Sequence, residues 1–194
     1  MVRPSTGSWR NASPLIISLL ALVLAGPGAT DARAEQSGAR SSLLAQQPPT
    51  ARSGLEKAHA QAERWQPDSA LRKISISAAT TSGAAMEDEG WTYIFYSKRL
   101  RRSYEISVFG TMTMGSEGTD AQAVAELEDL PDEFTDSSKA IELARTGGLQ
   151  PRSQIRMMLT KPADEPATWE VSSGNPGTLY LVDAEAGKFL RVKE

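Results

Sequence analysis

The stretch Trp91-Thr92-Tyr93-Ile94-Phe95-Tyr96 places an aromatic side chain at every second position from Trp91 to Phe95. Because the side chains of a strand alternate between its two faces, Trp91, Tyr93 and Phe95 are predicted to share one face. A similar strand begins at Trp169-Glu170-Val171, and 78 residues separate the two tryptophans. Each tryptophan follows a helix-like segment and a first strand and precedes a hairpin. The sequence therefore predicts two copies of one small α+β unit.

The segments around the two tryptophans set out the same plan twice. Residues 55–65 carry apolar side chains at helical spacing, and residues 71–79 and 104–109 each alternate as a strand does. In the second copy, a helix is expected from Thr135 or Asp136 to Gly147, and strands at residues 154–160, 169–171, 179–182 and 189–192. In each copy, one helix is expected to pack on a curved antiparallel sheet.

The domain layout follows from shifts in composition along the chain. Residues 35–54 are rich in Ser, Gln, Ala and Pro and are predicted to be a flexible linker. Residues 55–134 are predicted to be the first unit with an acidic connector, and residues 135–194 the second unit. The units have 80 and 60 residues and would each be marginal alone, so the two are expected to pack on each other.

Residues 1–34 have the pattern of a secretory signal peptide. Arg3 and Arg10 precede an uncharged apolar run at residues 15–25, and Ala32-Arg33-Ala34 offers a cleavage site. The run is shorter than the roughly 20 apolar residues that a transmembrane helix needs, although an uncleaved anchor is the alternative. We expect a periplasmic or secreted protein after cleavage near Ala34, with no membrane span remaining.

The bulk composition narrows the classes of site and partner. The 194 residues carry a formal net charge of −3 and include no cysteine and one histidine, His59. A mildly acidic chain is unlike a general nucleic-acid binder, which presents a basic surface. Lack of cysteine removes disulfides, thiolate nucleophiles and the residue that carries a bacterial lipid anchor. We expect no cofactor, no metal, no nucleic-acid partner and no lipid anchor.

Four cations gather in five residues between two predicted strands, at Lys98, Arg99, Arg101 and Arg102. These four are the candidate partner-binding residues, as a docking point for an acidic protein or an anionic headgroup. The alternative is a solubilising hairpin tip that protects a strand edge from aggregation. Residues 117–136 hold eight acids and no cation, and they could neutralise the tip within the molecule.

Three features of residues 135–194 match a known family pattern: a helix with Ser138, Ala140 and Ala144, the Trp169-Glu170-Val171 strand, and the hairpin Tyr180-Leu181-Val182-Asp183-Ala184-Glu185-Ala186-Gly187-Lys188. On these residues the second unit resembles a PepSY domain or its PepSY-like relatives. Residues 55–115 resemble a divergent first copy, which lacks the Asp-Ala turn between Tyr96 and Tyr104. The resemblance implies two cystatin-like α+β units in an exported bacterial protein. It also implies no catalysis, because PepSY domains are associated with regulation of peptidases and with protein interactions of the cell envelope.

Two functions from different classes fit these features. The first is a non-enzymatic protein-binding or regulatory module of the cell envelope, for example a peptidase inhibitor or modulator, whose partner is another envelope protein. The alternative is a periplasmic carrier of a small apolar ligand or lipid, in a sheet concavity lined by Trp91, Tyr93 and Phe95. A hydrolase with paired carboxylates is disfavoured, because the acids cluster in turns and in the connector rather than beside aromatic residues. We expect no enzymatic activity.

Overall fold

The computed structural model describes residues 49–150, 154–174 and 178–194, all within one compact unit. These residues form three helices and eight strands, which follow one another as α1 (Leu55–Trp65), β1 (Ser69–Ala79), β2 (Trp91–Ser97), β3 (Arg102–Phe109), β4 (Met112–Glu117), α2 (Ala121–Ala125), α3 (Ser137–Thr146), β5 (Ile155–Thr160), β6 (Thr168–Ser173), β7 (Leu179–Asp183) and β8 (Lys188–Lys193). The predicted signal peptide and most of the predicted linker lie outside the described residues.

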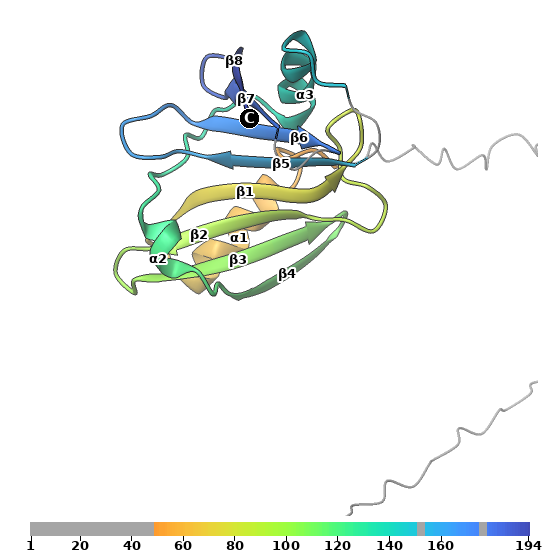
Figure 1. Ribbon diagram of the computed structural model, residues 1–194. Coiled ribbons are helices and arrows are strands. Elements are labelled where there is room, and N and C mark those ends of the chain that lie inside the picture. The colour runs from red at the N-terminus through yellow and green to blue at the C-terminus, as the bar shows by residue number, and fades with distance from the viewer. Residues whose placement is uncertain (1–48, 151–153, 175–177) are drawn as a thin grey trace, which may run out of the picture. The chain divides into compact units, whose positions relative to one another are not determined.

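The eight strands form one antiparallel sheet in the order β4-β3-β2-β1-β5-β6-β7-β8 (Figure 1). Its centre is β1, which pairs with β2 on one side and with β5 on the other. Ile74 of β1 is aligned with Tyr93 of β2 and with Leu159 of β5. The chain therefore crosses from the first half of the sheet to the second through a continuous hydrogen-bonded ladder.

This architecture shows that the predicted fold class is wrong. Two separate cystatin-like units, each one helix on its own curved sheet, were expected, but the structure is dominated by a single sheet. The physical reason is the pairing of β1 with β5. An unpaired strand edge exposes a row of backbone donors and acceptors, and joining these two strands removes both edges at once.

The order of elements is nevertheless the same in the two halves, a helix followed by four strands. The periodicity located α1, α3 and seven of the strands, but it missed β4. All six residues of β4 are exposed, so none of them has to be apolar and the strand leaves no core pattern in the sequence. The short helix α2, which buries only Val124, was also indistinct within the acidic connector.

Helices α1 and α3 cover one face of the sheet, α1 against β2 and β3 and α3 against β6, β7 and β8. Both helices begin after a segment that enters the core. Asp136 caps α3 by accepting a hydrogen bond from the backbone N–H of Ser137 at 2.8 Å. Ala58 and Ala62 of α1 and Ala140 and Ala144 of α3 are buried against the sheet. Small residues on these helix faces allow the bulky side chains of the strands to fill the layer between helices and sheet.

The core between helices and sheet is a single cluster that contains both tryptophans of the sequence pattern. Trp91 and Trp169 are each 0% exposed. The indole N–H of Trp91 donates to the backbone carbonyl of Pro49 at 2.9 Å, and that of Trp169 donates to the carbonyl of Thr135 at 2.7 Å. Each tryptophan therefore fixes the segment that leads into a helix, in the same way in both halves.

Candidate functional site

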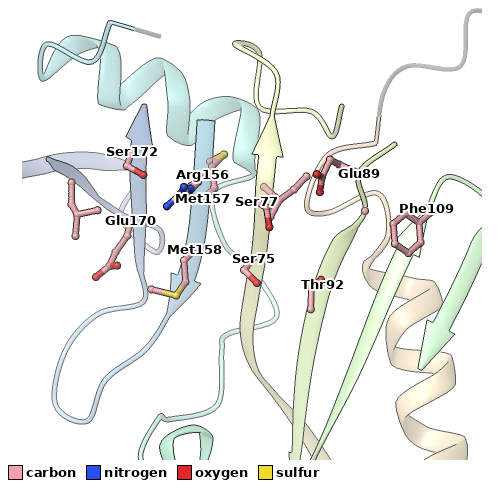
Figure 2. A pocket seen from close by; sticks show the side chains of 13 residues that line it. Ser75, Ser77, Glu89, Thr92, Phe109, Arg156, Met157, Met158, Glu170 and Ser172 are labelled. Carbon is pink, nitrogen blue, oxygen red and sulfur yellow. The ribbon is translucent and has the colours of Figure 1, made fainter. Parts of the chain in front are cut away.

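The face of the sheet opposite α1 and α3 carries a hollow of about 410 Å³ (Figure 2). Its floor lies at the centre of the sheet, where β2, β1, β5 and β6 run side by side. Hydroxyl groups from four residues of these strands line the floor: Ser75, Ser77, Thr92 and Ser172. A hydroxyl both donates and accepts hydrogen bonds, so this surface can pair with either kind of polar group.

The polar lining is the reverse side of the apolar core strands. Ser75 lies between Ile74 and Ile76, and Thr92 lies between Trp91 and Tyr93. Because successive side chains point to opposite faces, burying the apolar set against the helices turns the polar set outward. The fold of the core therefore builds the hollow without any further element.

A bulge in β1 lies beside this floor. The pairing of β1 with β5 is regular up to Ile76, opposite Met157, and then shifts before Ala79, opposite Ile155. Ser77 and Ala78 of β1 thus lie opposite the single residue Arg156 of β5, so β1 holds one extra residue. A bulge bends its strand and re-aims side chains, and such irregularities recur next to binding sites. The exposed Ser77 side chain lies within the hollow beside this bulge.

Three charged side chains surround the hydroxyl groups: Arg156 of β5, Glu170 of β6 and Glu89 before β2. Figure 2 shows Arg156 and Glu170 on one side of β1 and Glu89 on the other. Arg156 is exposed and makes no ion pair with any residue that the structure describes. An unpaired guanidinium is a ready donor for a carboxylate or carbonyl group of a partner.

The rim of the hollow is partly apolar, through Phe109, Met158 and Leu179. A floor of hydroxyls and charges with an apolar rim suits a polar or mixed partner. It does not suit the predicted carrier cavity, since Trp91, Tyr93 and Phe95 are all 0% exposed on the opposite, helix-covered face. In this structure the aromatic face is part of the buried core.

The predicted basic tip lies in the turn between β2 and β3, and most of it is neutralised within the molecule. Three of the four cations pair with acids: Lys98 with Asp129 at 3.7 Å, Arg99 with Asp68 at 3.8 Å, and Arg102 with Glu117 at 2.9 Å. Two of those acids belong to the predicted acidic segment, residues 117–136. Arg101 is exposed, has a positive φ of 55°, and makes no ion pair with the described residues.

The pKa of Asp68, at the base of this turn, lies below its usual value. Desolvation alone would raise the pKa, but hydrogen bonds from the Arg99 backbone N–H and the Ser97 hydroxyl stabilise the carboxylate and lower it. The carboxylate thereby fixes the turn. Docking by Lys98, Arg99, Arg101 and Arg102 stays a prediction, and any acidic partner would compete with the acids already in place.

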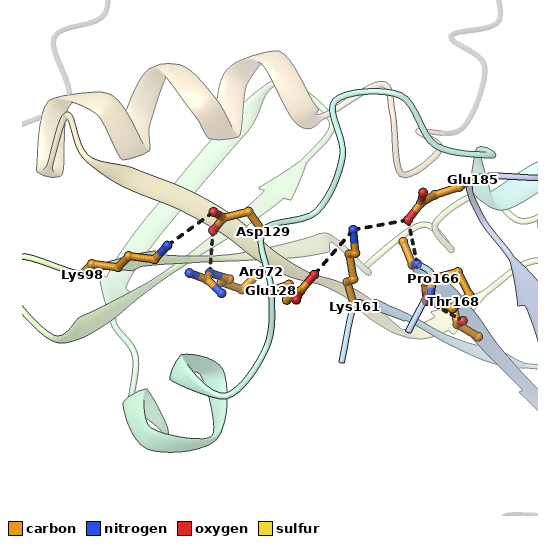
Figure 3. A network of polar contacts seen from close by, with 9 residues as sticks. Arg72, Lys98, Glu128, Asp129, Lys161, Pro166, Thr168 and Glu185 are labelled. Atoms are coloured by element: carbon orange, nitrogen blue, oxygen red, sulfur yellow. Dashed lines mark hydrogen bonds and ion pairs between the residues drawn. The ribbon is translucent and has the colours of Figure 1, made fainter. Parts of the chain in front are cut away.

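The acidic connector, which is the acidic segment at residues 117–136, ties the two halves of the sheet together through a chain of ion pairs (Figure 3). Asp129 lies 2.9 Å from Arg72, whose side chain is 4% exposed, in addition to its contact with Lys98. Glu128 and Glu185 each lie 3.6 Å from Lys161. The connector therefore makes specific ion pairs with both halves of the sheet and is not a loose linker.

His59 lies on α1, away from the hollow, and packs edge-on against Phe95 with ring centroids 5.1 Å apart. It borders a second hollow of about 380 Å³ between α1 and the connector, together with Asp129 and Asp132. The described residues include no cluster of histidine, cysteine and acidic side chains that could hold a metal ion. They also include no helix long and apolar enough to cross a membrane.

The lining of the hollow was missed at the level of the sequence, although a signal for it exists. Ser75, Ser77 and Thr92 are the residues that alternate with the predicted core positions. Such residues face solvent in a sheet covered on one side only. What the pattern could not show is that strands from both halves meet, so that Arg156 and Glu170 lie over the same floor as Ser75.

Comparison with known proteins gives a fold likeness. No family model and no curated protein matches the chain. A crystal structure of a "putative lipoprotein" from Clostridium difficile 630 is similar, with a TM-score of 0.50 and 15% sequence identity, over 72% of this chain and 91% of that chain. At this identity the likeness shows the fold alone. The PepSY resemblance stays a prediction.

The same comparison corrects one expectation about partners. The absence of a lipid anchor was inferred from the absence of cysteine, yet the similar protein is described as a "putative lipoprotein". The expectation of no lipid anchor is therefore withdrawn as wrong. The inference rested on the count of cysteines in this sequence alone, and that count says nothing of a longer chain.

Proposed function

We propose that this chain is an exported, non-enzymatic binding module of the bacterial cell envelope and that a protein partner docks on the open face of its sheet. The observation that carries the proposal is the hollow of about 410 Å³, floored by hydroxyl groups and bordered by Arg156 and Glu170. A solved structure of similar fold belongs to a protein described as a "putative lipoprotein", and this fits an envelope protein. The PepSY resemblance adds a peptidase as one candidate partner.

The partner's contact surface follows from the chemistry of the hollow. Hydroxyl groups of Ser75, Ser77 and Thr92 can pair with backbone N–H and C=O groups of a bound segment. Arg156 supplies a guanidinium for a carboxylate or carbonyl, and Phe109 at the rim supplies an aromatic anchor. This combination, polar groups at the centre and apolar anchors beside them, suits a protein surface better than a lipid tail.

A site-specific photocrosslinking experiment tests the proposal. A photoreactive amino acid at Ser77, exposed in the hollow, is expected to give an adduct of one defined mass in cells that make the full chain. The matched control places the same group at Glu56, which is exposed on α1 on the covered side of the sheet. Arg156→Glu should abolish the Ser77 adduct, because it reverses the only cation among the described residues that line the hollow.

Three outcomes would count against the proposal. Equal crosslinking from Ser77 and Glu56 would show contact without a specific face. A Ser77 adduct that survives Arg156→Glu would show that the charged floor contributes nothing to recognition. A Ser77 adduct containing lipid instead of protein would favour the carrier.

A further inference from the structure

The two outer edges of the sheet are β4 and β8, and they are protected very differently. β8 carries three cations, Lys188, Arg191 and Lys193, and a register shift interrupts its pairing with β7. Charged side chains and bulges are the usual means by which a free edge avoids pairing with another chain. The β8 edge is therefore guarded against intermolecular pairing.

The β4 edge has almost none of this protection. Its sequence Met-Thr-Met-Gly-Ser-Glu has one charged residue, Glu117, and its pairing with β3 runs without a register shift from Met112 to Glu117. Met112 and Met114 are each 67% exposed, the highest values among the large apolar side chains of the described residues. Among those residues β4 pairs only with β3, so its outer row of backbone groups is open. A flat, exposed, apolar edge of this kind is a pairing surface.

We propose that β4 pairs antiparallel with β4 of a second copy of this chain, across a two-fold axis at Met114. In this register Met112 lies opposite Ser116 of the partner subunit, and Thr113 lies opposite Gly115 of the partner subunit. Like charges do not face each other anywhere along the strand. A surface that pairs with itself in this way satisfies the requirement of a two-fold interface, in which one patch serves both copies.

Charge complementarity identifies the second copy as the occupant. The Lys57 ammonium group donates to the carbonyl of Gly110 at 2.8 Å, just before β4 begins. Glu117 ends the strand, where its carboxylate pairs with Arg102 of the same chain at 2.9 Å while its side chain stays 62% exposed. Both lie on the helix-covered side, because Glu117 is aligned with Tyr104, which stacks on Trp65 of α1. Antiparallel pairing reverses the direction of the second strand. Each Lys57 is then placed beside Glu117 of the partner subunit, twice across the axis.

The pairing would join two eight-stranded sheets edge to edge and continue the open face from one copy to the next. It goes beyond the proposed function, because it concerns the edge of the sheet and not the hollow. Failure to dimerise would leave docking at the hollow untouched, and failure of the hollow would leave the dimer untouched.

Disulfide trapping tests the register directly, because the chain has no cysteine of its own. Directly opposed residues of antiparallel strands have Cα atoms about 4.5–5.5 Å apart, within the range that a disulfide spans. Met114→Cys in the full chain is therefore expected to give a covalent dimer under mild oxidation. Met112→Cys should not, since two copies of residue 112 would lie roughly 14 Å apart along the strands. Leu190→Cys, on the β8 edge and 39% exposed, is the matched control.

Charge reversal gives a second test in solution. By sedimentation equilibrium, Lys57→Glu should weaken self-association about tenfold or more, because two attractive pairs become repulsive. The double variant K57E/E117K should restore part of it, because E117K re-forms the pairs across the axis but breaks the Arg102–Glu117 pair within each copy. The circular dichroism spectrum should be unchanged throughout. The proposal is overturned if the chain is monomeric, if Met114→Cys crosslinks no better than Leu190→Cys, or if Met114→Cys traps another protein instead of its own copy.

Discussion

The indole rings of Trp91 and Trp169 pack edge to face in the core, with their centroids 6.1 Å apart and their planes at 74°. The two residues lie in β2 and β6, on either side of the central pair β1 and β5. Edge-to-face contact is a favoured geometry for aromatic rings and adds to the gain from burying their area. The two halves of the sequence pattern therefore meet in one core, at the residues that mark the pattern.

Loss of either tryptophan is expected to destabilise the whole sheet. Trp91→Ala and Trp169→Ala should each lower the free energy of unfolding by about 3–5 kcal/mol, because each removes a fully buried ring and leaves a cavity. Urea unfolding followed by circular dichroism should still show one transition, because the core is shared. The exposed Thr113→Ala, on β4, should change the free energy by no more than about 0.5 kcal/mol.

The double variant separates a shared core from two independent ones. Since the rings touch, the effects of Trp91→Ala and Trp169→Ala should differ from additivity by about 0.5 kcal/mol or more. Strict additivity, or two transitions in urea, would mean that the halves unfold as separate units.

The Tyr93 hydroxyl predicts a loss of stability in alkaline solution. Burial raises the pKa of Tyr93 far above its ordinary value, and the charge of Asp136 adds to the shift. The hydroxyl donates to the carbonyl of Ala51 at 2.7 Å, a bond that only the protonated form can make. The stability this group contributes is fully present below about pH 10, the pKa of an unfolded tyrosine. Above that pH the unfolded chain releases a proton that the folded chain retains, so stability falls as pH rises.

Comparison with Tyr93→Phe isolates this contribution. Wild-type stability should fall by up to about 1.4 kcal/mol per pH unit above pH 10 from this residue, and the variant should lack that part of the slope. Urea midpoints measured from pH 8 to pH 11 provide the comparison. Parallel curves for the two proteins would show that the hydroxyl ionises while the chain is folded.

Local elements of this fold could be predicted from the sequence because they depend on short-range periodicity. The helix predicted at residues 55–65 is α1, and the alternation around Trp91 correctly placed Tyr93 and Phe95 in the core. The same alternation held for Trp169 and Val171. In each case burial on one side only leaves a period that adjacent residues display.

What could not be predicted depends on contacts between distant segments. Nothing in residues 69–79 shows that β1 pairs with β5 as well as with β2, and this pairing decides between two sheets and one. The hollow depends on the same pairing, since Arg156 and Ser75 come from those two strands. The basic tip was visible as a charge cluster, but its pairing with Asp68 required the turn to fold back on the end of α1.

The buried Arg72 makes Asp129 costly to neutralise. Asp129→Asn should lower the free energy of unfolding by about 1–3 kcal/mol, because it leaves a guanidinium group that is 4% exposed without its carboxylate at 2.9 Å. Lys98→Ala removes the other cation near Asp129, at 3.7 Å and 73% exposed, and should cost no more than about 0.5 kcal/mol. Thermal or urea unfolding of the two variants gives the comparison. Equal effects would show that Arg72 is satisfied by other groups.

The Ser137 hydroxyl supports a last prediction, because it joins three segments at the start of α3. It accepts a hydrogen bond from the backbone N–H of Ala51 at 3.1 Å and donates to the carbonyl of Gly83 at 2.7 Å. Its side chain is fully buried, so Ser137→Ala leaves a buried donor and a buried acceptor unpaired. The free energy of unfolding should fall by about 1–3 kcal/mol.

The neighbouring Ser138→Ala is the matched control, because it makes the same chemical change one position along α3, at a half-buried residue. Its effect should be about 0.5 kcal/mol or less. Hydrogen exchange sharpens the comparison, since the amide of Ala51 should lose protection in Ser137→Ala and keep it in Ser138→Ala. If Ala51 stays protected in both variants, contacts other than the Ser137 hydroxyl hold the segment entering α1, and Ser137 is not the residue that couples the two halves.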